Sequence, residues 1–353
     1  MNIEEDKGFS GIKNLGNTCF LNSCIQILSH TYELNIFIDN FFSTPPSENC
    51  DEISGEDLLL TKEYIDLIRL IWDHNCIITP MRFLNVVQSV ARIKNREIFT
   101  GFAQNDATEF LQFLIDCLEN ACSNNEILKR DIEHLFYGKL ISTISKFCGV
   151  KDVEKSKFCG VEDVEKCSIK DVEPPSIVSK QSEPFFILNI PIPSAPQNFD
   201  NNGEIPPPPT IYDCIAKFTD CEVLDGENKW YNEKTKEYES VIKKYDFDVF
   251  PQILVITLKR FNHTDKNEVL VIFGEMLEFS GGSAAAAEAQ PIKYELYGVC
   301  NHFGNAVFGH YTAFVKHNSG QWIHFNDHIV EKVSEFSNVI SPNAYCLFYR
   351  KRQ

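Results

Sequence analysis

The spacing of apolar residues divides the chain into two parts that differ in secondary structure. From residue 9 to about 125, apolar side chains recur every three or four residues, as in Asp57–Trp72 and Asn105–Cys122, which predicts a helical region. Beyond Glu183, short runs rich in β-branched and aromatic residues predict strands. These runs are Phe185–Ile190, Ile253–Leu258, Tyr294–Val299, Tyr311–Val315, Trp322–Phe325 and Ala344–Tyr349. We therefore expect an α+β fold with a helical first part and an antiparallel sheet.

Length, composition and charge exclude several classes of protein. The 353 residues, 43% of them hydrophobic, can bury one large core or two to three subdomains. No run approaches the roughly 18 apolar residues that cross a bilayer, and the acidic start Met1–Asp6 is unlike a signal or transit peptide. We expect no membrane segment and a location in the cytoplasm or nucleus. The net charge of −17 argues against a nucleic-acid partner, because such binding normally needs a concentrated basic face.

An internal repeat interrupts the pattern between the two parts. The eleven residues Ser145–Lys155 recur as Ser156–Lys166, with Glu162 in place of Lys151. Two copies are too few for a solenoid, so we interpret them as a tandem duplication in an exposed loop. Two further stretches, Pro206–Pro209 and Ser280–Ala287, are typical of surface connections.

The segment Gly11–Thr18 predicts a loop that presents Cys19 at the first turn of a helix. Asn17 and Thr18 are plausible N-caps, and apolar residues follow at helical spacing from Phe20 to Leu28. Free cysteine has a pKa of roughly 8.5, and a helix N-terminus next to a histidine lowers that pKa by several units. Judged by this segment alone, Cys19 is equally well a nucleophile or a small buried hydrophobe. The 13 cysteines are scattered without a secretion signal, which favours reduced thiols over disulfides.

A histidine and an amide later in the chain can complete a hydrolase site. His310 stands at the start of a predicted strand, and a second short strand ends at Asn326 and Asp327. If the two strands form a hairpin, an amide or a carboxylate comes beside the imidazole. A thiol, a histidine and an orienting residue far apart in sequence are typical of a cysteine hydrolase.

Two segments resemble the conserved boxes of the ubiquitin-specific proteases, which are papain-like cysteine deubiquitinases. Gly11–Leu28 resembles their cysteine box and Tyr294–Tyr349 their histidine box. Gln104–Phe110 resembles their Gln/Asp helix start, Leu135–Gly138 their entry to the fingers, and Phe250–Phe261 their core strand. The resemblance covers nearly the whole chain and implies a hand-like fold with a helical thumb, an antiparallel-sheet palm and β fingers.

The resemblance also implies a division of the chain. We expect 1–353 to form a single catalytic domain that starts near Phe9 and ends near Arg350 and leaves no room for a separate targeting or ubiquitin-binding domain. The thumb with the nucleophile is expected at 9–125, the fingers with the inserted repeat at 135–180 and 212–250, and the palm at 181–211 and 251–353.

By the same similarity, the site residues receive roles. Cys19 is the nucleophile, His310 the general base and then acid, and Asn326 the orienting residue, with Asp327 as the alternative. Asn14 matches the side chain of the oxyanion hole, and its other interpretation is an asparagine that stabilises a turn. An amide oxygen can orient the imidazole because it accepts the ring N–H.

The substrate-binding residues are also implied by the resemblance. Asp106 matches the position that binds the arginine-bearing tail of ubiquitin, and it can also complement the helix dipole. Gln104, Tyr311 and His302 are assigned to the same tail channel. The segments Asn262–Glu268 and Asn301–Phe308 are expected to be loops that cover the tail, which implies selectivity for two glycines before the cleaved bond.

The chain departs from its relatives at the fingertips, where many of them hold a structural zinc ion with two Cys-x-x-Cys pairs. No such pair is present, and Asn232 and Thr235 stand where thiols are expected. We therefore expect no metal and no cofactor. An irregular site made of His134, Cys148, Cys159 and Cys167 remains an alternative.

The expected activity is hydrolysis of the peptide or isopeptide bond after the C-terminal glycine of ubiquitin, through an acyl-enzyme. The expected partners are ubiquitin and ubiquitinated proteins, and we expect a monomer. Two alternatives remain at this point: a catalytically silent scaffold that binds ubiquitin, and a protease for a ubiquitin-like modifier.

Overall fold

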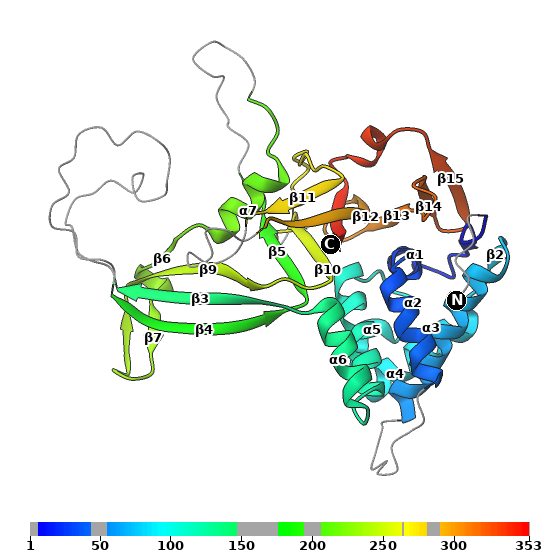
Figure 1. The fold of residues 1–353 in the computed structure, drawn as a ribbon, viewed down its shortest axis with the longest axis horizontal. Coiled ribbons are helices and arrows are strands. Elements are labelled where there is room, and N and C mark those ends of the chain that lie inside the picture. The colour runs from blue at the N-terminus through cyan, green and yellow to red at the C-terminus, as the bar shows by residue number, and fades with distance from the viewer. Residues whose placement is uncertain are drawn as a thin grey trace.

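The computed structural model describes residues 6–43, 55–146, 176–193, 206–262, 265–280 and 290–352 (Figure 1). Helices gather in one lobe, a large sheet lies against that lobe, and a smaller sheet extends away from both as an arm. Almost all of the predicted tandem repeat and of the stretch Ser280–Ala287 lies outside the described residues, so both interpretations stay predictions.

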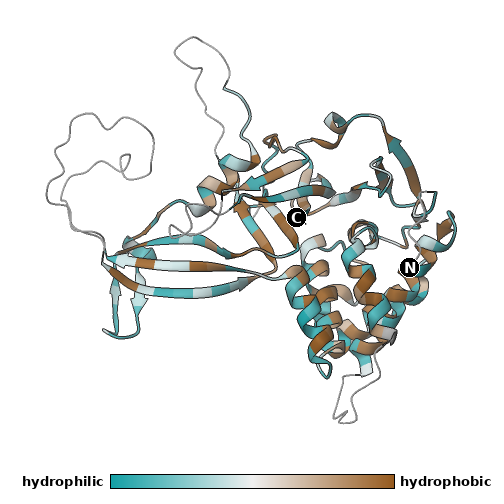
Figure 2. Ribbon diagram, in the orientation of Figure 1, coloured by the Kyte–Doolittle hydropathy of each residue, from teal (hydrophilic) through white to brown (hydrophobic). Residues whose placement is uncertain are grey.

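The helical lobe contains six helices among the described residues. They are α1 (Cys19–Ser29), α2 (Tyr32–Ser43), α3 (Gly55–Asp73), α4 (Met81–Ile93), α5 (Ala107–Ala121) and α6 (Glu126–Phe136). Their apolar stripes face one another in Figure 2, as expected for amphipathic helices that share a core. A short 3₁₀ turn, η1 (Glu97–Phe99), and a parallel pair of two-residue strands, β1 (Gly11–Ile12) and β2 (Ile77–Ile78), complete the lobe. The helical region extends to Phe136, about ten residues beyond the predicted end, because Asn125 caps one more helix.

The large sheet is antiparallel with one exception. Its order is β15-β14-β13-β12-β16-β10-β5, and β11 pairs with a separate part of β12. The sheet is antiparallel as predicted except at one edge, where β5 and β10 run parallel. The strands are β5 (Ile187–Pro191), β10 (Ile253–Lys259), β11 (Met276–Phe279), β12 (Ile292–Gly304), β13 (Gly309–Lys316), β14 (Trp322–Asn326), β15 (Ile329–Val333) and β16 (Ala344–Arg352).

The arm is a four-stranded antiparallel sheet in the order β4-β3-β9-β6, with a hairpin of β7 and β8 beside it. The strands are β3 (Gly138–Lys146), β4 (Ile177–Phe185), β6 (Glu222–Leu224), β7 (Trp230–Asn232), β8 (Glu237–Glu239) and β9 (Val241–Val249). The proline run 206–209, predicted as a surface connection, leads into the helix α7 (Ile211–Thr219), which Thr210 and Asp213 open with a capping box. Two 3₁₀ turns, η2 (Gly226–Asn228) and η3 (Phe336–Val339), lie in connections.

The central helix α1 joins the lobe to the large sheet. All eleven of its residues are buried, because one side packs on the other helices and the other side packs on β12, β13 and β14. A helix that is buried on all sides lies in the core of a protein, and the polar side chains Asn22, Gln26 and Ser29 of α1 bond the main chain there. This packing holds the first residue of α1, Cys19, against the sheet that carries His310.

Candidate active site

Cys19 is the first residue of α1 and is 3% exposed. A tight turn precedes it, in which Gly16 and Asn17 adopt positive φ angles of 102° and 55°. Thr18 occupies the N-cap position, but its hydroxyl accepts the N–H of Leu15 at 3.0 Å and makes no capping hydrogen bond to the helix. The first N–H groups of a helix have no acceptor within the helix. The Cys19 thiol therefore stands at a helix end with main-chain donors.

His310 and Asn326 come together from neighbouring antiparallel strands, as the sequence predicted. The Nε2 of His310 donates to Oδ1 of Asn326 at 2.7 Å. A hydrogen bond with the Cys19 side chain is the main cause that raises the pKa of His310 to about 9, against the effect of burial, and the Asn326 contact and the nearby charges of Cys19 and Asp327 add to it. The imidazolium form is favoured at neutral pH, which is the form that stabilises a neighbouring thiolate.

Asp327 does not contact His310 but serves a different group of residues. Its carboxylate accepts from Nδ2 of Asn14 at 3.0 Å and from Nδ2 of Asn22 at 2.8 Å. Its main-chain oxygen accepts the N–H of Ile12 at 2.9 Å, and its φ of 52° gives the strand end a sharp turn. Of the two candidates for the orienting position, Asn326 is the one whose side chain bonds the imidazole.

Asn14 is held on both ends of its amide. While Nδ2 donates to Asp327, Oδ1 accepts the main-chain N–H of Gly16 at 3.0 Å and of Thr18 at 3.2 Å. Both interpretations of Asn14 are thus compatible, because the contacts that stabilise the turn also fix the amide in front of α1. The second N–H of the amide is not used by Asp327.

The sequence analysis missed Asn22, which is buried and bridges α1 to Asp327 and to the main-chain oxygen of Ile12. Its position three residues after Cys19 places the two side chains on one face of the helix. That spacing is the signal in the sequence, because Asn22, Gln26 and Ser29 form a polar row beside the apolar stripe.

Asp106 is the N-cap of α5 and also holds two tyrosines. Its Oδ1 accepts the main-chain N–H groups of Thr108 at 2.8 Å and Glu109 at 3.1 Å. Its Oδ2 accepts the hydroxyls of Tyr345 at 2.8 Å and Tyr311 at 3.4 Å. The helix-dipole role is therefore present. Tyr345 was missed, since nothing in a run of buried strand residues marks the one that reaches across to a helix cap.

Gln104 pairs with the main chain of Gly309 rather than lying free in a channel. Its Nε2 donates to the oxygen of Gly309 at 2.8 Å, and the N–H of Gly309 donates to Oε1 at 2.7 Å. The two residues are separated by 205 positions in the sequence, so this contact joins the helical lobe to the start of β13.

His302 lies on β12 and is only 5% exposed. The centre of its ring is 4.9 Å from that of Phe261 and 4.8 Å from that of Tyr311. Burial and the charge of Lys266 lower its pKa to about 4, so the ring is neutral. The segment Asn301–Phe308 was predicted to be a loop, but 301–304 extend β12 and pair with 309–312 of β13. Only Asn305–Phe308 form the turn. Of the predicted loop Asn262–Glu268, residues 263 and 264 lie outside the described part.

In the described part of the chain, no group of three or more His, Cys, Asp or Glu side chains could hold a metal ion. The alternative site with His134 depends on cysteines that lie outside that part. Asn232 and Thr235, at the positions of the expected thiols, both donate to Oε1 of Glu239 at 2.8 Å. Hydrogen bonds thus close this hairpin. The described helices also include none long and apolar enough to cross a membrane.

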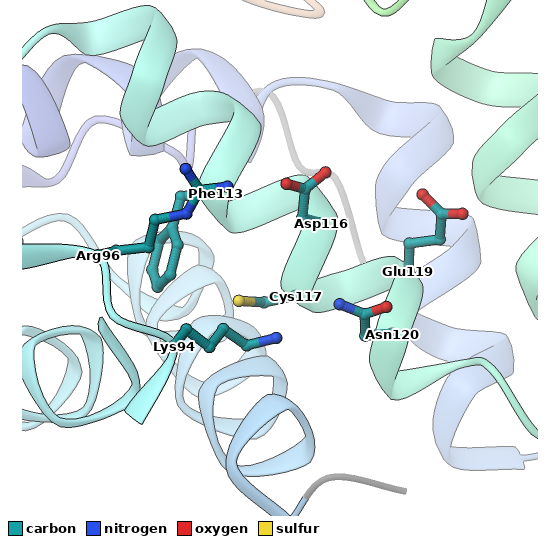
Figure 3. Close-up of a pocket in the computed structure, with 7 residues that line it drawn as sticks. All are labelled: Lys94, Arg96, Phe113, Asp116, Cys117, Glu119 and Asn120. Atoms are coloured by element: carbon teal, nitrogen blue, oxygen red, sulfur yellow. The ribbon is translucent and has the colours of Figure 1, made fainter. Parts of the chain in front are cut away.

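A pocket of about 390 Å³ lies elsewhere in the helical lobe. Figure 3 shows basic and acidic side chains around it, from the end of α4 and from α5. None of its lining residues is a candidate site residue; they are Lys94, Arg96, Phe113, Asp116, Cys117, Glu119 and Asn120.

Comparisons with known proteins agree with this arrangement. Ubiquitin carboxyl-terminal hydrolase 2 from Gallus gallus is 32% identical to this chain, over 97% of this chain and 93% of its own length. The human enzyme of the same name is 31% identical over 99% of this chain, but the chain spans only 56% of the human protein, about half of its length.

Among solved structures, the SAGA Ubp8/Sgf11/Sus1/Sgf73 DUB module bound to ubiquitin aldehyde superimposes with a TM-score of 0.72 at 23% identity, over 100% of this chain and 71% of that one. This likeness confirms the predicted α+β, hand-like fold. The sequence pattern described as "Ubiquitin carboxyl-terminal hydrolase" matches residues 10–349. The chain therefore belongs to the ubiquitin carboxyl-terminal hydrolase family.

Proposed function

We propose that the protein is a thiol-dependent deubiquitinase, which hydrolyses the peptide or isopeptide bond after the C-terminal glycine of ubiquitin. The observation that carries this proposal is the place of His310, which lies 2.7 Å from Asn326 and has a pKa raised mainly by the Cys19 side chain. Family membership supports it, and so do the relatives that are named ubiquitin carboxyl-terminal hydrolases. A structural neighbour whose title includes bound ubiquitin aldehyde supports the same substrate.

The proposed reaction begins with the thiolate of Cys19, whose proton resides on His310. The sulfur attacks the carbonyl carbon of the terminal glycine, and the C=O electrons move to the oxygen. His310 then donates its proton to the leaving amine as the C–N bond breaks, which leaves a thioester. Water attacks the thioester while His310 accepts a proton from the water. The C–S bond then breaks, which releases the carboxylate of ubiquitin and restores the Cys19 thiolate beside protonated His310. Asn326 keeps the imidazole oriented throughout.

The developing oxyanion is assigned two donors. One is the free N–H of the Asn14 amide, and the other is the main-chain N–H of Cys19 at the helix start. Removing one such donor typically costs about 3 kcal/mol of transition-state stabilisation. Asp327 acts on this step indirectly, because it holds the Asn14 amide in place.

For the substrate tail, we propose that Asp106 receives an arginine and that Gln104, Tyr311 and His302 border the channel. A carboxylate has about four lone-pair sites, and the oxygens of Asp106 already serve the cap and two tyrosines. The guanidinium of the incoming arginine therefore binds a carboxylate that these contacts already orient. Because His302 is buried, its contribution is to the shape of the channel wall.

The remaining parts of the proposal follow the same family pattern. The chain acts as one catalytic domain with a thumb at 9–125, fingers at 135–180 and 212–250, and a palm at 181–211 and 251–353. Ubiquitinated proteins are its partners, nucleic acids and membranes are not, and it works as a monomer in the cytoplasm or nucleus. The charge of −17 supports a basic protein partner.

The test is labelling with ubiquitin that carries an electrophile at its C-terminus. Wild-type protein should form a covalent adduct at Cys19, Cys19→Ala should form none, and the exposed cysteine variant Cys221→Ala should react like wild type. An adduct at another cysteine, or no adduct with folded protein, would overturn the proposal. Tight ubiquitin binding without cleavage of a fluorogenic ubiquitin substrate would identify a scaffold. The same probe made with ubiquitin-like modifiers tests the other alternative, a protease for such a modifier.

A further inference from the structure

We propose that Gln104 is a positioning residue, which fixes His310 relative to Cys19 through the main chain of Gly309. The inference rests on the proposed function, since it assigns a part in the same reaction. It refines the place beside the substrate tail that the family resemblance gives to Gln104: the side chain borders the channel, but its amide holds the strand of the base.

The first argument is the geometry of the Gln104 side chain. Its amide uses both an N–H and its oxygen on the two main-chain groups of Gly309, at 2.8 and 2.7 Å. This is the pattern by which a neighbouring strand holds a residue in a β-ladder. The residue that follows Gly309 is His310, so the contact fixes the peptide from which the imidazole extends.

The second argument is that two contacts from one segment hold the chain on both sides of His310. Gln104 bonds Gly309, and Asp106 accepts the hydroxyl of Tyr311 at 3.4 Å. Residues 104 and 106 precede or cap α5, which packs against α1. The strand of the base is thus tied to the lobe that carries Cys19, on either side of the base.

The third argument is that the surroundings of Gly309 are closely packed. A Cβ atom at this position would lie 2.0 Å from Nε2 of His302 and 2.6 Å from the main-chain oxygen of Phe303. On the other strand Gly309 pairs with Gly304, at the end of a hairpin whose tip residues Val307 and Phe308 are 67% and 68% exposed. A hairpin end with an exposed tip depends on the contacts at its base, and Gln104 supplies two of them.

The test compares Gln104→Ala and Gln104→Glu with wild type. The Glu variant keeps the shape and the acceptor for the N–H of Gly309, but it places a second oxygen against the carbonyl. The control is Asn105→Ala, because the neighbouring amide of Asn105 bonds only locally, to the oxygen of Ala103 at 3.1 Å. The Gln104 side chain is exposed, so the variants should keep the fold, which melting temperatures check.

Two measurements separate positioning from substrate binding. With a fluorogenic ubiquitin substrate, both Gln104 variants should lose on the order of ten- to a hundredfold in kcat with little change in KM, as expected for a misplaced base. In addition, alkylation of Cys19 by iodoacetamide at neutral pH should slow, because a displaced imidazole is a poorer base for the thiol. Asn105→Ala should match wild type in both.

A rise in KM with unchanged kcat and an unchanged alkylation rate would overturn the inference and make Gln104 a tail contact. Full activity of Gln104→Glu would overturn it as well. Alkylation needs no ubiquitin. A wild-type protein that reacts normally with iodoacetamide but does not cleave ubiquitin would therefore overturn the proposed function and leave the inference about Gln104 standing.

Discussion

At the scale of single residues, two neighbours at the end of β14 divide their contacts between two parts of the site. Asn326 meets His310, whereas Asp327 meets Asn14 and Asn22. Asn326 is the last residue of β14, whereas Asp327 already lies in the turn with a φ of 52°, which explains why the two side chains reach different partners. The sequence indicated the pair, but the choice depended on the orientation of β14 and on a turn at Asp327 that no pattern encodes.

Loss of the orienting amide should affect catalysis more than stability. In Asn326→Ala the ring of His310 loses its acceptor, so we expect kcat for a fluorogenic ubiquitin substrate to fall on the order of 10²-fold. Asn326→Asp, which keeps an acceptor at the same place, should retain most of the activity. Equal kcat values for wild type and Asn326→Ala would contradict the assignment.

The pKa of His310 predicts how stability depends on pH. The folded pKa, about 9, lies above the ordinary value of 6.5, so the protonated ring is favoured by folding. The resulting stabilisation is fully present below pH 6.5 and is lost as the pH rises through about 9. The difference in melting temperature between wild type and His310→Gln should therefore shrink from pH 6 to pH 9.5. A difference that grows with pH would show that the shift has the opposite sign.

At the scale of elements, apolar residues that recur every three or four positions located the helices well. Short apolar runs located the strands of the large sheet. The parallel pairing of β5 with β10 could not be predicted, because it depends on a long crossover through the arm. The extension of β12 to Gly304 was also missed, since 301–304 contain polar and small residues that suggest a loop. Pairing with β13 overrides that local preference.

This hairpin gives an element-scale prediction at Gly309. A methyl group there would meet His302, so Gly309→Ala should lower the free energy of unfolding by about 1–3 kcal/mol and reduce kcat. Gly55→Ala is the control, because a Cβ there meets no atom within 4 Å, and its stability should change by less than about 0.5 kcal/mol. Urea unfolding measures both. Equal stability of the two variants would show that the hairpin can shift at no cost.

At the scale of the whole molecule, the proposed nucleophile and base belong to different parts. Cys19 begins a buried helix of the lobe, and His310 is the second residue of β13 in the large sheet. The sequence predicted both parts and the separation of the two residues, since each segment had its own periodicity. It could not predict the contacts that join them, such as Gln104 with Gly309, because those depend on side chains 205 positions apart.

The net charge acts at this scale as well. A chain of charge −17 should attract a basic partner over a distance that salt shortens. Raising the salt concentration from about 50 to about 500 mM should therefore lower kcat/KM for a ubiquitin substrate while kcat stays constant. Alkylation of Cys19 by uncharged iodoacetamide serves as the control and should not change. A kcat/KM that is independent of salt would exclude electrostatic steering.

The arm offers a practical consequence for protein engineering. β3 and β4 stay paired from Gly138 with Phe185 to Ser145 with Ile177, and the duplicated eleven residues enter the chain only where this ladder ends. The two strands keep one register from Gly138 to Ile144, and the register shifts only at Ser145, the first residue of the repeat. A fluorescent reporter or an affinity tag placed between residues 150 and 170 would enter the chain after β3 and before β4, and these two strands lie in the arm, away from the helix α1 that begins with Cys19 (Figure 1).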